Sequence, residues 1–219
     1  MNIIWLGHAA FLITTEEGTR IIMDPYESDA YGGGIGYSPI QETADIVTIS
    51  HTQHQDHCFT DGIAGDPVIL TEAGERSVKG VSIKGIPSFH DKSGGQERGN
   101  NLITCLDADG IRLVHMGDLG HLLTAEQVDA VGRPDVLLIP VGGTFTLDAK
   151  EATETVNRLN PRQVVPMHFK NTKCNLPIHT VDAFLEGKTN VRRSLGTSLE
   201  IRSESMPETT EIVVLDHSL

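Results

Sequence analysis

Short apolar runs separated by polar turns make up the first part of the chain. Residues 3–6, 11–15 and 20–23 are three such runs, and the turns at 7–10 and 16–19 predict that they form an antiparallel meander. An Asp-Pro pair ends the third run, because proline has no backbone N–H with which to continue a ladder. Further strands are predicted at 46–49, 67–70, 81–86, 102–106, 111–115, 135–140, 163–167, 199–202 and 211–215.

Helical patterns are concentrated in the second half of the chain. A Thr-x-x-Gln sequence at 124–127 has capping-box spacing and predicts a helix that ends near Gly132. An Asp-x-x-Glu sequence at 148–151 predicts a second helix, which runs to about Leu159 before an Asn-Pro pair stops it. A third, short helix is expected at 181–186. Strands in both halves with helices in the second indicate an α+β protein.

Composition limits the classes of function. A length of 219 residues fits a single domain over 1–219. The chain has neither a long apolar run nor a signal-like start, so we expect a soluble, cytoplasmic protein without a membrane partner. Three widely spaced cysteines, Cys58, Cys105 and Cys174, agree with a reducing compartment. The formal net charge of −13 opposes nucleic-acid binding, which depends on neutralising phosphates with Lys and Arg.

The densest chemistry of the chain follows the apolar run at 46–49. His51, His54, Asp56 and His57 lie within seven residues of one another. Neutral imidazole and carboxylate are ligands of zinc, manganese and iron, and a strand that ends in such a loop fixes the geometry of the ligands. The alternative is a polar surface loop with several exposed histidines. The spacing favours a metal site.

This loop resembles the His-x-His-x-Asp-His motif of the metallo-β-lactamase superfamily, and nearly the whole chain resembles the branch of metal-dependent hydrolases that includes ascorbate-6-phosphate lactonases. His54, Asp56 and His57 match the second, third and fourth positions of the motif. The first position falls on Thr52, and His51 lies one residue earlier. We expect His51 to be the first ligand, reached through a one-residue bulge, because a threonine hydroxyl is a poor zinc ligand. The opposing interpretation keeps Thr52 at this position, so that water fills the gap and the first metal binds weakly through His54 and His90 alone.

The resemblance also implies the remaining site residues. A strand-end histidine completes the first metal site, an aspartate bridges both ions, and a last histidine completes the second site. Asp24 would hold the metal loop from behind, and His8 either lines the pocket or binds backbone. The metal ligands implied are His51, His54, Asp56, His57, His90, Asp118 and His168.

The fold implied by the resemblance is an αβ/βα four-layer sandwich with two central, mostly antiparallel sheets and outer helices. The cofactors implied are two divalent ions, for which zinc is preferred and manganese or iron is also compatible. A metal-bound hydroxide would then hydrolyse a small ester, lactone or phosphoester. Asp56 would orient the water, and the leaving group would receive its proton from a metal-bound water or from a nearby histidine such as His121.

Two glycine-rich segments are expected to border this site. Residues 26–41 lack periodicity and are interpreted as a flap. Residues 92–101 form a second loop, in which Arg98 could either bind an anionic group of a small-molecule substrate or form a salt bridge with an acidic residue of the chain. Pro140 to Gly143 resemble the Pro-Val-Gly-Gly of the family, and the glycines Gly142 and Gly143 could offer N–H groups to an oxyanion. A non-catalytic metal-binding protein and a di-metal redox protein remain alternatives, and the sequence leaves a homo-oligomer open.

Overall fold

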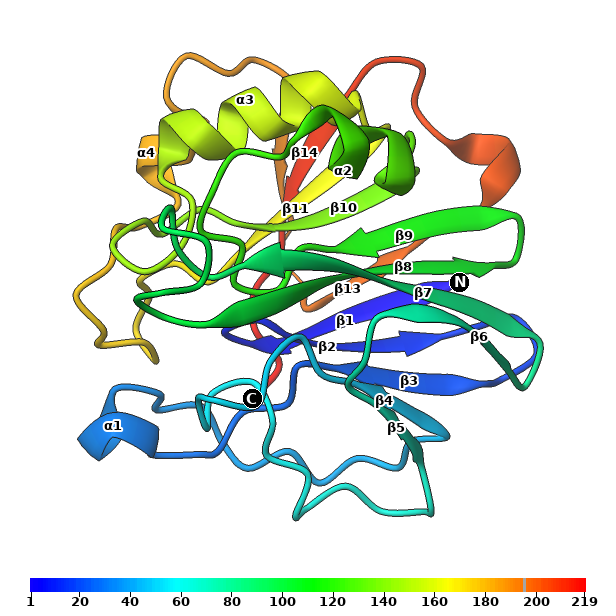
Figure 1. Ribbon diagram of the computed structural model, residues 1–219. Helices are drawn as coiled ribbons and strands as arrows, with labels where there is room; N and C mark the ends of the chain where they lie inside the picture. Colours follow the sequence, from blue (N-terminus) through cyan, green and yellow to red (C-terminus); the bar gives the residue numbers. More distant parts are fainter. Residues whose placement is uncertain (195) are drawn as a thin grey trace.

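The computed structural model describes residues 1–194 and 196–219, which form two packed β-sheets (Figure 1). The six strands of the smaller sheet are, in spatial order, β13 (Ser198–Glu200), β1 (Asn2–Gly7), β2 (Ala10–Thr14), β3 (Arg20–Met23), β4 (Ile46–Thr48) and β5 (Val68–Leu70). The eight strands of the larger sheet are β12 (Val191–Arg193), β14 (Glu211–Val214), β11 (Gln163–Met167), β10 (Val136–Pro140), β9 (Ile111–His115), β8 (Asn100–Ala108), β7 (Val81–Phe89) and β6 (Gly74–Val78).

Both sheets are mixed, whereas the resemblance predicted mostly antiparallel ones. The meander β1 to β3 is antiparallel as expected, and so is the run from β6 to β9. Strands β3 to β5 are parallel to one another, as are β9, β10, β11, β14 and β12. Crossover segments explain the difference, because a connection that passes over a sheet face returns the chain to the end from which it started.

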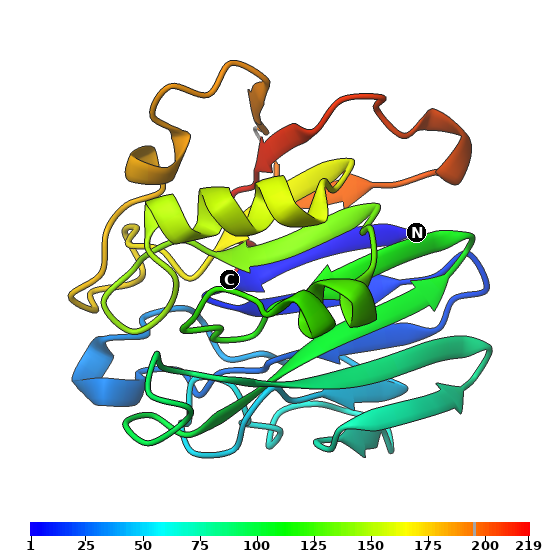
Figure 2. The same ribbon diagram turned by 45° about the horizontal axis from the view of Figure 1, so that its top comes forward.

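Three of the helices cover the larger sheet. Helices α2 (Ala125–Val131), α3 (Ala149–Leu159) and α4 (Asp182–Leu185) form a row on one face of the larger sheet, in which α3 contacts both other helices and α2 also contacts β7 (Figure 2). Both predicted capping boxes are present, at Thr124 and at Asp148. A short 3₁₀ turn, η1 (Ser203–Ser205), follows β13. The sandwich is thus confirmed, with its helical layer on one side.

The outer face of the smaller sheet is covered by the glycine-rich chain that follows β3. This segment contains the helical turn α1 (Ala30–Gly33), which the sequence did not predict. Tyr26, Ile35 and Tyr37 are buried there against the sheet in a second apolar cluster. The main apolar cluster fills the space between the sheets and beneath the helices. Among the described residues, no helix is long and apolar enough to cross a membrane.

Two strands were missed by the sequence pattern. The residues of β6 are mostly exposed, so they carry no alternation of apolar and polar side chains. Strand β12 has only three residues and pairs in parallel with β14. Strand β7 runs further than the predicted 81–86 and includes Pro87. A proline is tolerated there because the pairing of β6 with β7 ends at Gly85, so the ladder on that side does not need an N–H from Pro87.

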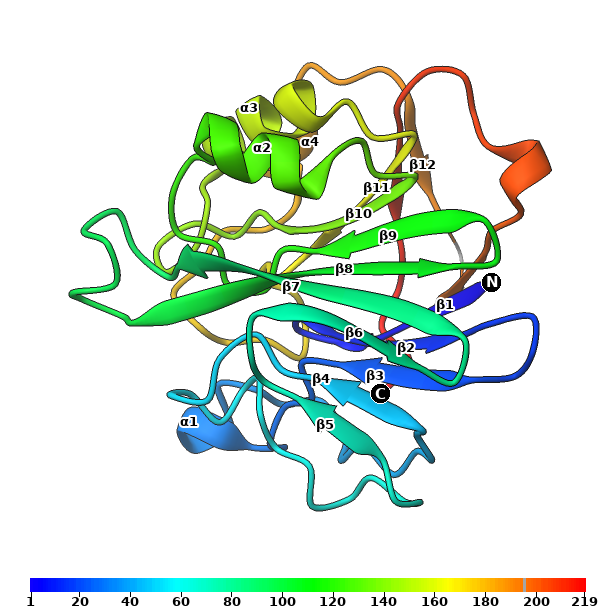
Figure 3. The same cartoon turned by 45° about the vertical axis from the view of Figure 1, so that its right-hand side comes forward.

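The topology brings distant parts of the sequence to one edge of the sandwich. In the smaller sheet β1, β3 and β4 run in the same direction, and in the larger sheet β7, β9 and β11 do so. The loops that follow these strands gather at the same side of the molecule (Figure 1, Figure 3). These loops carry His8, Asp24, the 51–57 segment, His90, Asp118 and His168.

Candidate metal centre

The predicted ligands converge at this edge although they span more than half of the sequence. Six of them are buried and His54 is half-buried. The exceptional burial of so many ionisable side chains already indicates a bound partner, since unpaired buried polar groups are costly. The six buried residues are His51, Asp56, His57, His90, Asp118 and His168.

One group of ligand atoms comes from three histidines. His51, His54 and His90 each offer a nitrogen, and these nitrogens lie within 4.8 Å of one another. The Nε2 atom of His51 is 3.1 Å from Nδ1 of His54. Thr52 is exposed on the surface of the same loop. The geometry therefore favours His51 as the first ligand, and that assignment remains a prediction.

The extra residue between His51 and His54 is not accommodated by a β-bulge. Strand β4 ends at Thr48, and the residues from Thr52 to His54 form bends outside any ladder. An irregular loop absorbs an inserted residue without shifting the register of a sheet, because no strand partner has to be matched there.

A second group surrounds Asp118. Asp56, Asp118 and His168 offer ligand atoms within 4.8 Å of one another, and His57 joins Asp118 in the same way. Oδ1 of Asp118 is 3.0 Å from Nε2 of His57 and 3.5 Å from Nε2 of His168. Oδ2 of Asp118 is 3.1 Å from Nε2 of His90, which belongs to the first group. Asp118 thus has one oxygen toward each group, which is the position of a bridging carboxylate.

The donor set fits two divalent cations. Among the described residues, both ring nitrogens of His57 and Oδ1 of Asp118 are buried without a hydrogen-bond partner, and so is Nδ1 of His168. Nε2 of His57 and Oδ1 of Asp118 face one another at 3.0 Å, and a cation bound between them would satisfy both atoms. Imidazole nitrogen with carboxylate oxygen suits zinc, manganese or iron.

The protonation states agree with this interpretation. Burial, together with neighbouring positive imidazoles, lowers the pKa values of His51 and His168 to about 3. Both rings are therefore neutral at physiological pH and have a lone pair for a metal. Burial opposes the charged form of His57 as well, but the carboxylates of Asp118 and Asp56 outweigh it and raise the pKa of His57 well above its ordinary value. In the metal-free protein His57 carries the charge that balances these carboxylates.

Asp24 holds His51 through Ser50. The backbone N–H and the hydroxyl of Ser50 both donate to the Asp24 carboxylate at 2.7 Å. Because the Ser50 hydroxyl proton points to Asp24, its oxygen accepts from Nδ1–H of His51 at 2.9 Å. This chain of hydrogen bonds fixes the tautomer of His51 and leaves Nε2 free for the metal. The geometry agrees with the expected role of Asp24.

The Asp118 loop is held by a residue that the sequence analysis missed. The backbone N–H of Asp118 donates to Oδ1 of Asn101 at 2.9 Å, and Nδ2 of Asn101 donates to the carbonyl of Met116 at 3.0 Å. Gly117 has φ 55°, and a Cβ there would collide with Asn101 and Ser50. The glycine therefore lets the two loops pack closely.

His8 lies inside the site and does not bond backbone through its ring. The side chain is fully buried, with Nε2 3.3 Å from Oδ2 of Asp56. Its ring centroid is 4.1 Å from that of His168. The carbonyl of His8 accepts hydrogen bonds from the Trp5 indole at 3.0 Å and from the His168 backbone at 3.1 Å, which fixes the turn. His8 therefore lies behind Asp56, and it is not among the described residues that line the cavity.

His121 is not placed as a proton donor. Its Nε2 accepts from the backbone N–H of Phe89 at 3.2 Å, and its Nδ1–H donates to the carbonyl of Leu122 at 2.8 Å. The chain turns away after Asp118 at Gly120, where a Cβ would collide with the backbone of His90. Closeness in sequence to Asp118 therefore did not bring His121 into the site.

The glycines after β10 do not form an oxyanion hole in the way expected. The N–H of Gly143 donates to the carbonyl of Leu147 at 3.1 Å and is already used. Gly142 instead allows a close approach, since a Cβ there would collide with the carbonyl of His168. This glycine supports the position of the last histidine.

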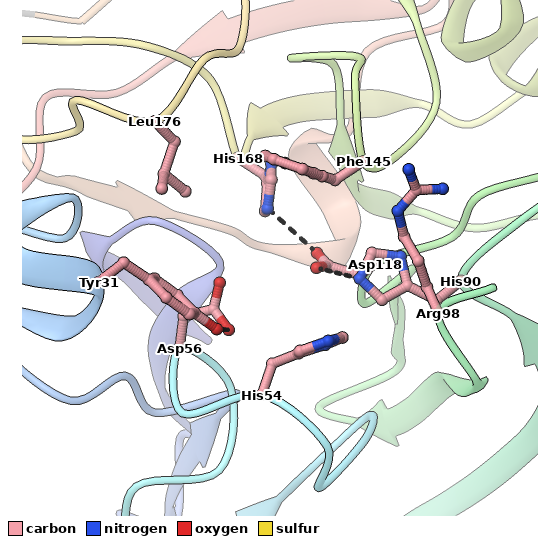
Figure 4. A pocket seen from close by; sticks show the side chains of 9 residues that line it. All are labelled: Tyr31, His54, Asp56, His90, Arg98, Asp118, Phe145, His168 and Leu176. Atoms are coloured by element: carbon pink, nitrogen blue, oxygen red, sulfur yellow. Dashed lines mark hydrogen bonds and ion pairs between the residues drawn. The ribbon is translucent and has the colours of Figure 1, made fainter.

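A cavity of about 260 Å³ opens above the two ligand groups (Figure 4). Arg98 and Phe145 stand on one side of it, and Tyr31 and Leu176 on the other. The Tyr31 hydroxyl donates to Oδ1 of Asp56 at 3.0 Å. Tyr31 belongs to α1, so the glycine-rich segment does border the site, as expected. The described lining residues are Tyr31, His54, Asp56, His90, Arg98, Asp118, Phe145, His168 and Leu176.

Comparison with known proteins decides the family. The family model described as the Beta-lactamase superfamily domain matches residues 2–168, which include every predicted metal ligand. The chain belongs to the β-lactamase superfamily. The resemblance stated from the metal-loop motif is thereby confirmed, while the narrower likeness to ascorbate-6-phosphate lactonases stays a prediction.

Relatives of this superfamily member cover most of its length. A UPF0173 metal-dependent hydrolase from Thermococcus onnurineus is 30% identical in an alignment 194 positions long, which covers 77% of this chain and 84% of the relative. The crystal structure of a candidate Zn-dependent hydrolase of the metallo-β-lactamase superfamily from Thermotoga maritima matches with a TM-score of 0.81 and 36% identity, over 98% of this chain and 97% of that chain. CmlA, a diiron β-hydroxylase from Streptomyces venezuelae, matches with a TM-score of 0.54 and 16% identity over 76% of this chain and 44% of that chain, and so shares the fold alone.

Proposed function

We propose that this member of the β-lactamase superfamily is a metal-dependent hydrolase that cleaves a small-molecule ester, lactone or phosphoester. The observation that carries the proposal is Asp118, which has one carboxylate oxygen beside His57 and the other beside His90, at the floor of an open cavity. The relatives named metal-dependent hydrolase support the reaction class.

The residues present would hold two ions. His51, His54 and His90 would bind one, and Asp56, His57 and His168 the other, with Asp118 between them. Bound divalent ions supply an activated water and a Lewis acid for the oxygen of the scissile bond. Imidazole and carboxylate donors suit zinc, manganese and iron, and we propose zinc as the preferred metal for both ions.

Asp56 has a second task, which is to orient the reacting water. Its carboxylate is fixed from two sides, by the Tyr31 hydroxyl at 3.0 Å and by His8 at 3.3 Å. Burial opposes the ionised form of Asp56, yet His57 and His8 outweigh it and keep the pKa of this carboxyl below its usual range. Burial and then the charge of Asp56 raise the pKa of Tyr31, so its hydroxyl keeps its proton as a donor. Fixed groups of this kind lower the cost of reorganisation during the reaction.

The fold also carries redox chemistry, as the diiron β-hydroxylase shows. The observation against that class is the complete nitrogen-rich ligand set, which retains His57 beside Asp118. A non-catalytic metal-binding protein is the other alternative, and it is an outcome of the test below.

The test combines elemental analysis with a hydrolase panel. We expect close to two divalent ions per chain after metal-replete expression, and turnover of at least one ester, lactone or phosphoester substrate. Asp118→Asn keeps the shape of the side chain but removes the shared charge, so we expect loss of one ion and at least a 100-fold fall in kcat. Asp129→Asn, an exposed position on α2, is the matched control. Full metal content without turnover on any substrate would leave a metal-binding protein instead of an enzyme.

A further inference from the structure

We infer that the substrate carries an anionic group, a carboxylate or a phosphate, which Arg98 binds at the side of the cavity while a short apolar part of the substrate lies against Phe145 and Leu176. This inference rests on the proposed function, because it names the substrate class of the same site. It starts from an arginine that lines the cavity together with the metal ligands (Figure 4).

The guanidinium of Arg98 has donors to spare. A guanidinium has five N–H groups. Among the described residues, those of Arg98 make no hydrogen bond, and the ion pair with Glu97 has its nearest atoms 3.6 Å apart. Glu97 is largely exposed, and an exposed pair of this length contributes little to stability. The planar fork is thus available for a bidentate contact with a carboxylate or phosphate.

Arg98 is also held in place before any ligand arrives. Its guanidinium carbon lies 5.8 Å from the centre of the Phe145 ring, a distance at which a cation is attracted to an aromatic face. This contact directs the charged end of the side chain to the wall of the cavity. The ring of Phe145 provides an apolar surface beside the charge.

The loop that carries Arg98 is organised by one buried carboxylate. Asp91 accepts hydrogen bonds from the backbone N–H groups of Ser93, Gly95, Glu97 and Arg98, at 2.8, 2.9, 3.0 and 2.7 Å. Asp91 directly follows the ligand His90, so the loop and the metal site share one anchor. An ordered loop has less conformational entropy to lose when the substrate binds.

The charges and the size of the cavity define the rest of the substrate. The floor holds the carboxylates of Asp56 and Asp118, which bound cations would neutralise. Among the described residues that line the cavity, Arg98 is the one basic side chain of the lysine or arginine type. A volume of about 260 Å³ admits only a small molecule. Phe145, Leu176 and the ring of Tyr31 leave room for a short apolar segment between the anion and the scissile bond. We therefore expect a small ester or lactone with an acidic substituent.

Matched esters test the inference. 4-Nitrophenyl hydrogen adipate carries a carboxylate, its methyl ester is the neutral counterpart, and 4-nitrophenyl 4-phosphonooxybutyrate carries a phosphate. The metal-replete wild-type protein should prefer at least one of the anionic esters over the neutral ester in kcat/KM. Arg98→Gln should lower kcat/KM for that anionic ester about 10- to 100-fold, chiefly through KM, since hydrogen bonds between charged groups have this strength. The neutral ester should change less than about twofold, which also shows that the variant is folded.

Two further variants sharpen the result. Arg98→Lys keeps the charge but loses the fork, so it should recover only part of the preference. Lys92→Gln removes the same charge from the same loop, and its side chain pairs with Glu151 outside the described cavity lining. It should leave the preference unchanged. An equal fall in Lys92→Gln would mean that overall charge attracts the anion and would overturn the role of Arg98.

The design separates failure of the inference from failure of the proposed function. Hydrolysis of both ester types with no dependence on Arg98 overturns the inference and leaves the hydrolase intact. If the metal-replete protein cleaves none of the esters, the hydrolase proposal is contradicted for this bond type, and calorimetry with adipate and with inorganic phosphate then decides the inference. Weaker binding to Arg98→Gln than to the wild type and Lys92→Gln supports it, and equal binding overturns it.

Discussion

Replacing Ser50 by alanine tests how the metal loop is held. The change removes the hydroxyl that links Asp24 to His51 and with it two buried hydrogen bonds, of 2.7 and 2.9 Å. Nδ1 of His51 then has no partner to fix its tautomer, and one oxygen of Asp24 loses a donor. Loss of a hydrogen-bond partner behind a ligating histidine typically weakens metal affinity about 10- to 100-fold, or about 1.4–2.8 kcal/mol.

We expect this loss to fall on one of the two ions. His51 belongs to the group with His54 and His90, so the other group should keep its affinity within about threefold. The apoprotein should also lose about 1–3 kcal/mol of unfolding free energy, because the buried carboxylate of Asp24 is left with fewer donors. Competition with a chromophoric zinc chelator measures the two dissociation constants, and urea unfolding measures the stability.

Thr52→Ala is the control, since it removes a hydroxyl from an exposed neighbour in the same loop. It should leave both zinc affinities unchanged. Wild-type affinities in Ser50→Ala would refute the reasoning about the hydrogen-bonded chain. Weaker zinc binding in Thr52→Ala together with unchanged binding in His51→Ala would assign the first ligand position to the threonine.

Three other predictions concern the same site. His8→Gln should lower kcat about 10- to 100-fold with little change in KM, since it loosens the carboxylate of Asp56, and unchanged steady-state kinetics would contradict this. Gly117→Ala should destabilise the protein by about 1–3 kcal/mol in urea unfolding because of its positive φ, and wild-type stability would show that the loops can separate at no cost. In the metal-free protein, the low pKa values of His51 and His168 contribute stability that is complete above pH 6.5 and is lost as the pH falls toward 3. Burial lowers the pKa of His8 but its hydrogen bonds raise it to about 9, so its contribution is complete below pH 6.5 and is lost as the pH rises toward 9; a stability profile that stays flat on both sides would contradict these assignments.

Much of the fold was predictable because it depends on neighbours in sequence. The meander of β1 to β3 follows from apolar runs and polar turns, and both capping boxes lie within four residues. The ligand-rich loop after β4 was equally visible, because His51, His54, Asp56 and His57 are close together in the chain.

The tertiary structure decided what depends on residues far apart in sequence. Strand β6 forms because it pairs with β7. The parallel pairs arise from crossover connections, which no local sequence pattern predicts. Tyr31 enters the site from a glycine-rich turn, and Asn101 holds the Asp118 loop from another strand. His121, beside Asp118 in sequence, bonds backbone elsewhere.

The sequence by itself therefore determined which groups could bind metal, because ligand chemistry is a property of the side chains. Only the fold decided which groups meet. Strand directions bring His8, His90 and His168 to one edge of the sandwich. These histidines are buried there, and ring nitrogens without a hydrogen-bond partner lie close to carboxylate oxygens. That convergence is a consequence of topology, since six separate strand ends must point in the same direction before one site can form.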